Sequence, residues 1–252
     1  MCYNGYAAVP NLGKICEVLT DDFNTLDTNT WQREVRLDGY GTGGFQWTTA
    51  DDKNSFVEDG ILYIVPTLTS DDIGEDKVFN GGVVNLTVDG TCTSTNVSQC
   101  AAVSNSSRLT VINPVKSARL ITKNTHSIKY GKVEVKAKFP TGDWLWPSIT
   151  MLPVNETYGA WPRSGQIDLL TGRGNNASYP NRGVDYAQSD LHWGECGLVF
   201  STSKLYDANF RPEHRSRPIV HDLGIPRTAS NVLQPRVAHL RSGMERQVHV
   251  DL

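Results

Sequence analysis

Residues 132–138, with the sequence KVEVKAK, alternate strictly between charged and apolar side chains. Val133, Val135 and Ala137 fall on one side of an extended chain, and the charged residues fall on the other. A period of two is typical of a β-strand with one buried and one solvated face. The stretches GGFQW and GILYIVP are also rich in β-forming residues, and no long segment has a 3.6-residue period. With Gly and Pro turns at short spacing, this pattern predicts an all-β sandwich or barrel.

The length and charge of the chain limit the kinds of partner that it can have. Its 252 residues, 38% of them hydrophobic, suffice for one β-sandwich domain with a buried core. The net charge is −3 and the basic residues are spread along the chain, which argues against nucleic acid as a partner. No apolar run approaches the roughly 20 residues that span a bilayer, so we expect no membrane span. A monomer is the default expectation.

Several features point to an extracellular or cell-wall protein. The N-terminal sequence MCYNGYAAVPNLGKIC has no basic region followed by an apolar run, so we expect a secreted protein whose signal is missing from this sequence. A disulfide between Cys92 and Cys100 could close the nonapeptide CTSTNVSQC. Cys2 and Cys16 could form a second pair, which leaves Cys196 odd; alternatively, all five cysteines are reduced thiols. Five N-x-S/T triplets are candidate glycosylation sites, at Asn85, Asn96, Asn105, Asn155 and Asn176.

The chain changes character near Gly194. From Arg211 onward it contains no Phe, Tyr or Trp, its alternation is poor, and four of the six histidines occur there: His214, His221, His239 and His249. We divide the chain into an N-terminal extension (1–17), a sandwich region (18–194) and a divergent tail (195–252). The tail is either an ordinary polar region or the product of a shifted reading frame or retained intron. The second hypothesis predicts a poorly packed C-terminus and an incomplete sandwich with exposed strand edges.

Residues 66–107 are polar and rich in Gly, Ser, Thr and Asn, and they are predicted to form a long loop. The segment SGQIDLLTG, in contrast, is predicted to be a strand that carries the functional side chains. Gln166 and Asp168 are two residues apart and share a face. Thr171 is five residues from Gln166, which is the wrong parity for a regular strand. One extra residue near positions 169–170, a β-bulge, would bring Thr171 onto the same face.

The stretch WPRSGQIDLLTGRGN resembles the signature of glycoside hydrolase family 16, whose laminarinase-like branch carries E-x-D-x-x-E after W-P-x-x-G. The resemblance extends upstream through SARLITKNTHSIKYGKVEVKAKFPTGDWLWPSITM and downstream to DLHWG, and it covers residues 18–194. It is strongest to secreted fungal endo-β-1,3(4)-glucanases. It implies a β-jelly-roll sandwich with a concave glycan cleft, and hydrolysis of β-glucan by a retaining mechanism in which two carboxylates act as nucleophile and acid/base.

This sequence departs from the family at both catalytic positions. Gln166 stands at the nucleophile position, and an amide is far less nucleophilic than a carboxylate. Thr171 stands at the acid/base position, and a hydroxyl supplies no proton near neutral pH. Asp168 remains, as the only carboxylate expected on this face. Thr150 replaces a family Trp, which removes one sugar-stacking platform. These departures predict an inactive or nearly inactive hydrolase fold.

The aromatic side chains that the motif retains could still bind a glycan. Trp161 resembles a cleft-lining residue of the family, His192 and Trp193 resemble a downstream pair, and Trp144 and Trp146 lie in the DWLWP segment. Indole faces pack against sugar C–H groups. The alternative for each Trp is core packing, which is favoured for Trp146.

The sequence predicts no metal site and no cofactor. The histidines of the tail lack Cys/His ligand spacing. A structural calcium is possible by resemblance to the family, but no run of ligands fixes one. The resulting hypothesis is a secreted family 16-like domain that binds β-1,3- or mixed-linkage β-glucan without cutting it. The alternatives are an active retaining endo-β-1,3(4)-glucanase in cell-wall polysaccharide metabolism and a truncated, non-functional product.

Overall fold

The computed structural model describes residues 16–180, 183–194, 200–207, 236–237 and 246–251. The chain divides into two compact units, one up to Ser127 and one from Ile128 onward. The division into residues 1–17, 18–194 and 195–252 stays a prediction. Cys2 and Cys196 lie outside the described residues, as do His214, His221 and His239. Among the described residues, no helix is long and apolar enough to cross a membrane.

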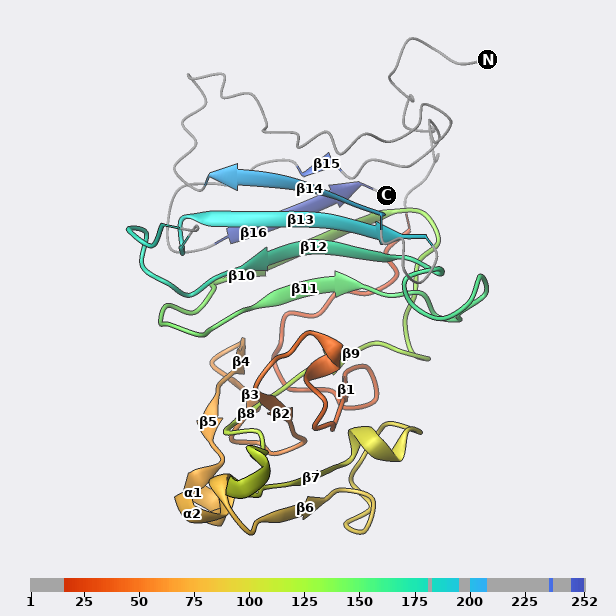
Figure 1. Ribbon diagram of the computed structural model, residues 1–252. Helices are drawn as coiled ribbons and strands as arrows, with labels where there is room; N and C mark the ends of the chain where they lie inside the picture. Colours follow the sequence, from red (N-terminus) through yellow and green to blue (C-terminus); the bar gives the residue numbers. More distant parts are fainter. Residues whose placement is uncertain (1–15, 181–182, 195–199, 208–235, 238–245, 252) are drawn as a thin grey trace. The chain divides into compact units, whose positions relative to one another are not determined.

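The first unit consists of short strands and single helical turns (Figure 1). Its small sheets pair β1 with β9, β3 with β4, β6 with β7, and β8 with both β2 and β5. The elements are β1 (Gln32–Arg33), η1 (Gly39–Gly41), β2 (Gln46–Thr48), β3 (Ser55–Glu58), β4 (Ile61–Ile64), β5 (Thr67–Leu68), α1 (Ser70–Ile73), α2 (Glu75–Phe79), β6 (Val83–Asn85), η2 (Val97–Gln99), β7 (Ala101–Val103), η3 (Ser106–Arg108), β8 (Val115–Ser117) and β9 (Leu120–Ile121).

The segment 66–107 is not the long loop that its composition predicts. It forms α1, α2 and the β6–β7 pair, because scattered apolar side chains anchor it to a core. Cys92 and Cys100 are joined in a disulfide with Cα atoms 5.7 Å apart. Cys16 is exposed and forms no disulfide in the described part of the chain. The core cluster comprises Val35, Leu37, Val84, Leu86, Cys100 and Ile112.

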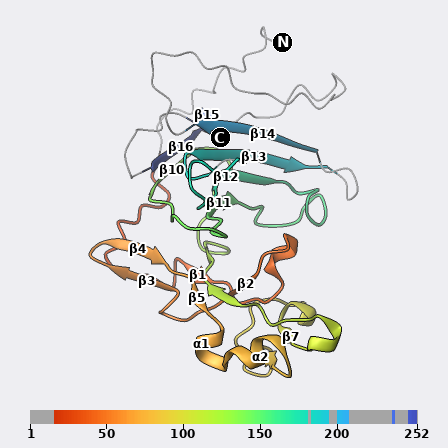
Figure 2. The same ribbon diagram turned by 60° about the vertical axis from the view of Figure 1, so that its left-hand side comes forward.

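The second unit contains two sheets of longer strands (Figures 1 and 2). One sheet has four antiparallel strands in the order β11-β12-β13-β14, and the other has the order β10-β16-β15. Sequential antiparallel neighbours of this kind need only short connections. The strands are β10 (Lys132–Ala137), β11 (Ser148–Met151), β12 (Gln166–Gly172), β13 (Tyr186–Trp193), β14 (Phe200–Asp207), β15 (Arg236–Val237) and β16 (Arg246–Asp251).

The core of the second unit lies between the two sheets. Leu169, Leu170 and Ala187 are its buried centre, and Val133 of β10 packs against them. In β10 the charged residues are exposed and the apolar ones are half-buried, as the alternation predicted. The all-β class predicted from the sequence is therefore confirmed, and two facing sheets form the sandwich.

Candidate functional site

The outer face of β12 and β13 brings the predicted catalytic positions together. The register of β12 against β13 shifts between Asp168 and Thr171, so the predicted β-bulge is confirmed. Leu169 and Leu170 both enter the core as a result. Thr171 returns to the face of Gln166 and Asp168.

Three residues of β13 lie directly opposite these positions. His192 pairs with Gln166, Asp190 with Asp168, and Gln188 with Thr171. Sequence analysis missed Gln188 and Asp190, although YAQSDLHW alternates and so places both on the face of His192. Asp168 is therefore not the only carboxylate on the face, which corrects the expectation that it lacks a like-charged neighbour. The resemblance extends through DLHWG but implies a site role only for His192 and Trp193, so neither Gln188 nor Asp190 was predicted.

A chain of hydrogen bonds fixes the side chains at the start of β12. The Trp161 Nε1–H donates to Oε1 of Gln166 at 3.0 Å. Gln166 Nε2 in turn donates to Oδ1 of Asp168 at 2.6 Å. The other oxygen of Asp168, Oδ2, lies 2.8 Å from Nε2 of His192. Both oxygens of the Asp168 carboxylate are thus engaged by the protein.

The far end of the face is also hydrogen-bonded within the sheet. The Thr171 hydroxyl donates to the backbone carbonyl of Gln188 at 3.3 Å. Gln188 Nε2 donates to Oδ2 of Asp190 at 2.7 Å. Asp168 and Asp190 are only 6% and 8% exposed, so two carboxylates lie side by side away from solvent.

The surroundings shift the pKa of two of these groups. Burial raises the pKa of the Asp190 carboxyl, against the opposing effects of the Gln188 hydrogen bond and the His192 charge. The hydrogen bond with Asp168 raises the pKa of the His192 ring, and burial opposes this. Both shifts follow the ordinary rules for desolvation and charge pairing. The positive form of His192 is therefore favoured beside the two carboxylates.

The predicted aromatic residues lie near both ends of β12. Trp161 is 48% exposed, and its ring lies 6.1 Å from the ring of His192. Trp193 is half-buried at the end of β13. Trp144 and Trp146 are 87% and 67% exposed, so the core-packing interpretation of Trp146 is wrong.

The loop that carries Trp144 and Trp146 is anchored beside the end of β12. The backbone N–H of Gly142 donates to the carbonyl of Gly174 at 2.7 Å, and the N–H of Gly174 donates to the carbonyl of Leu145 at 2.8 Å. A Cβ on Gly174 would collide with Gly142 O and lie 2.8 Å from Leu145 Cβ. A glycine is required at this position because the two backbone segments approach so closely.

Thr150 and the glycosylation triplets can also be placed. Thr150 of β11 pairs with Asp168, so the missing family Trp would have stood next to the polar face. Asn96, Asn155 and Asn176 are exposed, and Asn85 and Asn105 are half-buried. All five asparagines lie in described segments at the surface, where a glycan could be attached.

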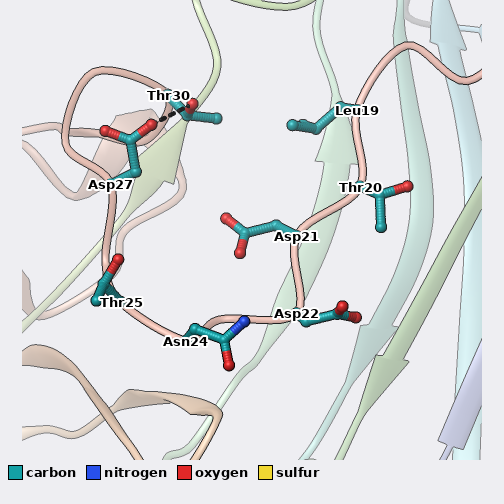
Figure 3. Close-up of a pocket in the computed structure, with 8 residues that line it drawn as sticks. All are labelled: Leu19, Thr20, Asp21, Asp22, Asn24, Thr25, Asp27 and Thr30. Carbon is teal, nitrogen blue, oxygen red and sulfur yellow. Dashed lines mark hydrogen bonds between the residues drawn. The ribbon is translucent and has the colours of Figure 1, made fainter.

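A pocket in the first unit gathers three acidic residues (Figure 3). Asp21 accepts hydrogen bonds from the Trp31 indole and the Phe23 N–H, and Asp27 accepts from Asn29 and Thr30. The oxygens of Asp21 and Asp27 thus accept hydrogen bonds from N–H and O–H donors of their own loop. The pocket is lined by Leu19, Thr20, Asp21, Asp22, Asn24, Thr25, Asp27 and Thr30.

Sequence comparison places the chain among known proteins. The β-1,3-glucan-binding protein of Penaeus monodon is 41% identical over 182 residues, which are 71% of this chain and 49% of that relative. The chain is a homologue of β-1,3-glucan-binding proteins. The glucan endo-1,3-β-glucosidase A1 of Niallia circulans is 31% identical to the present chain over 164 residues, which are 61% of this chain and 19% of that relative. The predicted relationship to glycoside hydrolase family 16 is thereby confirmed; its fungal branch is not.

The present chain spans about half or less of the length of these relatives. A solved structure, the laminarinase catalytic domain of Thermotoga maritima, aligns with 72% of the chain and 57% of its own chain, at 23% identity and a TM-score of 0.44. No family model matches the sequence.

Proposed function

We propose that this chain binds a β-1,3- or mixed-linkage β-glucan on the outer face of β12 and β13 and does not hydrolyse it. One observation carries the proposal: both catalytic positions hold neutral side chains that are hydrogen-bonded to the protein itself. Gln166 is held between Trp161 and Asp168, and Thr171 is bonded to the backbone of β13. The aromatic residues near them remain exposed.

Hydrolysis with retention needs two carboxyl groups about 5–5.5 Å apart on either side of the scissile bond. The amide of Gln166 is a poor nucleophile, and general acid/base catalysis alone contributes about 10²–10⁴-fold. Asp168 does not replace the nucleophile, because Gln166 and His192 occupy its two oxygens. Asp190 lies buried beside Asp168 on the next strand and so does not face it from the other side of a scissile bond.

The same face retains what glycan binding requires. Gln166 and Thr171 pair with His192 and Gln188, which are four positions apart on β13; this corresponds to roughly 13 Å of strand and fits an oligosaccharide rather than one sugar. Trp161 lies near one end of this span, and the loop of Trp144 and Trp146 is anchored near the other. Flat indole faces with polar N–H and amide groups beside them suit neutral sugars. The name of the Penaeus monodon relative agrees with this choice of ligand.

We also propose that the chain is a secreted glycoprotein that acts as a monomeric pseudoenzyme outside the cell or in the cell wall. The Cys92–Cys100 disulfide supports an oxidising compartment. Asn96 and Asn176 are exposed within their triplets and suit glycan attachment.

Calorimetric titration with laminarin and with a mixed-linkage β-glucan, with reducing ends followed on the same sample, tests the proposal. Binding without new reducing ends is expected. Trp161→Ala should weaken binding about tenfold, because one aromatic platform is worth about 1.4 kcal/mol. Phe79→Ala, an exposed aromatic residue of the first unit, is the matched control and should bind normally.

Two results would contradict the proposal. New reducing ends from the unaltered chain would favour the active glucanase. A folded chain that binds neither glucan would exclude the binding function. The double variant Gln166→Glu/Thr171→Glu then shows whether the two acids are all that hydrolysis lacks.

A further inference from the structure

Three potential metal ligands meet on the outer face of the four-stranded sheet. One ligand atom each from Asp168, Asp190 and His192 lies within 4.8 Å of the others. The register explains the meeting, because Asp168 and Asp190 are cross-strand partners and His192 follows Asp190 by two residues on the same face. We propose that these three side chains form a binding site for a divalent transition-metal ion of the zinc class.

The charge of the cluster favours a cation. Two carboxylates directly opposite each other on neighbouring strands repel, and here both are buried. Among the described residues, His192 is the one cationic group in contact with these carboxylates, so two ionised carboxylates outweigh even a protonated ring. A divalent ion bound to two carboxylates and a neutral imidazole makes the site neutral overall.

A second observation comes from Asp190 alone. Asp190 is only 8% exposed, and among the described residues its one hydrogen bond comes from Gln188 Nε2 to Oδ2. Within the described residues, Oδ1 of Asp190 therefore accepts no hydrogen bond. A carboxylate oxygen that accepts no hydrogen bond is available as a metal ligand.

The distances suit insertion of an ion with small movements. Zinc binds imidazole nitrogen and carboxylate oxygen at about 2.0–2.2 Å, so two ligand atoms of a tetrahedral site lie about 3.4 Å apart. His192 Nε2 and Asp168 Oδ2 are 2.8 Å apart, and they would separate by about 0.6 Å. Gln166 still donates to the other oxygen of Asp168, which orients the ligand from outside the site.

The choice of metal follows from the donor set. One imidazole with two carboxylates suits zinc, nickel or cobalt, whereas calcium and magnesium prefer six or more oxygen ligands. Three protein ligands leave a fourth position for water. Spacing along the chain did not reveal this set, because Asp168 lies on β12 and the other two ligands lie on β13.

Calorimetric titration of the full, chelator-stripped chain with ZnCl₂ tests this site, and MgCl₂ serves as the second ion. We expect one zinc ion per chain, no measurable magnesium binding, and a rise in Tm with zinc. His192→Gln and Asp190→Asn should each weaken zinc binding at least tenfold. Glu156→Gln, which removes an exposed carboxylate of the same unit, should bind zinc as the unaltered chain does.

Two outcomes would contradict the proposed zinc site. Absence of zinc binding by the unaltered chain refutes it directly. Zinc binding that survives unchanged in His192→Gln assigns the metal to other groups of the chain. If Asp190→Asn fails to fold by circular dichroism, His192→Gln alone decides. The titration contains no glucan, so its result is independent of the proposed glucan-binding function.

Discussion

Breaking the Cys92–Cys100 disulfide should destabilise the first unit by an amount that its loop length sets. The two cysteines are eight positions apart, so the bridge closes a loop of nine residues. In the chain-entropy model, a loop of this size lowers the entropy of the unfolded chain by about 8.6 cal/mol/K. The free energy of unfolding should therefore fall by about 2.5 kcal/mol at 25 °C when the bridge is opened.

Hydrogen exchange can measure this loss inside the unit. The Ile112 amide is fully buried and donates to the Val78 carbonyl at 2.9 Å, so its exchange requires the core around Cys100 to open. A loss of about 2.5 kcal/mol corresponds to exchange about 70-fold faster. The measurement compares oxidised protein, thiol-reduced protein and Cys92→Ala by mass spectrometry. Reduction keeps both sulfur atoms in place, so it creates no cavity.

The control is Cys16→Ala, which removes an exposed cysteine outside the bridge and should leave the exchange of Ile112 unchanged. Acceleration below threefold in the reduced protein would refute the reasoning. It would mean either that the unfolded chain already holds the loop closed or that Ile112 exchanges without opening this core.

Three further predictions concern single residues. Burial raises the pKa of Tyr40 to about 12, above its ordinary value of 10.0. The folded state thus binds more protons between these values, so stability should fall as pH rises through this window, and ultraviolet titration should show one late tyrosine that Tyr40→Phe removes. Gly174→Ala should weaken laminarin binding about tenfold in calorimetry, by displacing the loop that carries Trp144. Leu170→Ala should cost about 2–5 kcal/mol in urea unfolding, whereas Leu170→Met should cost less than about 1.5 kcal/mol.

Odd or even residue spacing along the strands was the most informative property of the sequence at the site. The five-residue spacing of Gln166 and Thr171 does not fit a regular strand, and the resemblance implies that both residues share a face; together these predicted the bulge that the register shows. The alternation of residues 132–138 likewise predicted β10 and its wet face. The alternation depends only on local geometry, which a sequence carries directly, whereas the bulge also needed the resemblance.

Pairing between distant strands is not visible in the same way. Asp190 belongs to the site because β13 lies beside β12 in one particular register, and no local pattern states that register. The polar composition of residues 66–107 also led to the wrong prediction of a long loop. Val78, Val84 and Leu86 are few among many polar residues, yet all three are buried, and a few well-placed apolar side chains are enough to order a polar segment.

The hydrogen bond of Gln166 explains why restoring one acid should not restore hydrolysis. Its Nε2 donates to Asp168 at 2.6 Å. In Gln166→Glu a carboxylate oxygen would replace this donor, and two carboxylates so close together do not both ionise. The pair would share a proton, the pKa of one carboxyl would rise, and stability at neutral pH would fall. Because Thr171 still supplies no acid, laminarin should stay intact. Turnover by this single variant, measured as new reducing ends, would show that another group of the face acts as the acid.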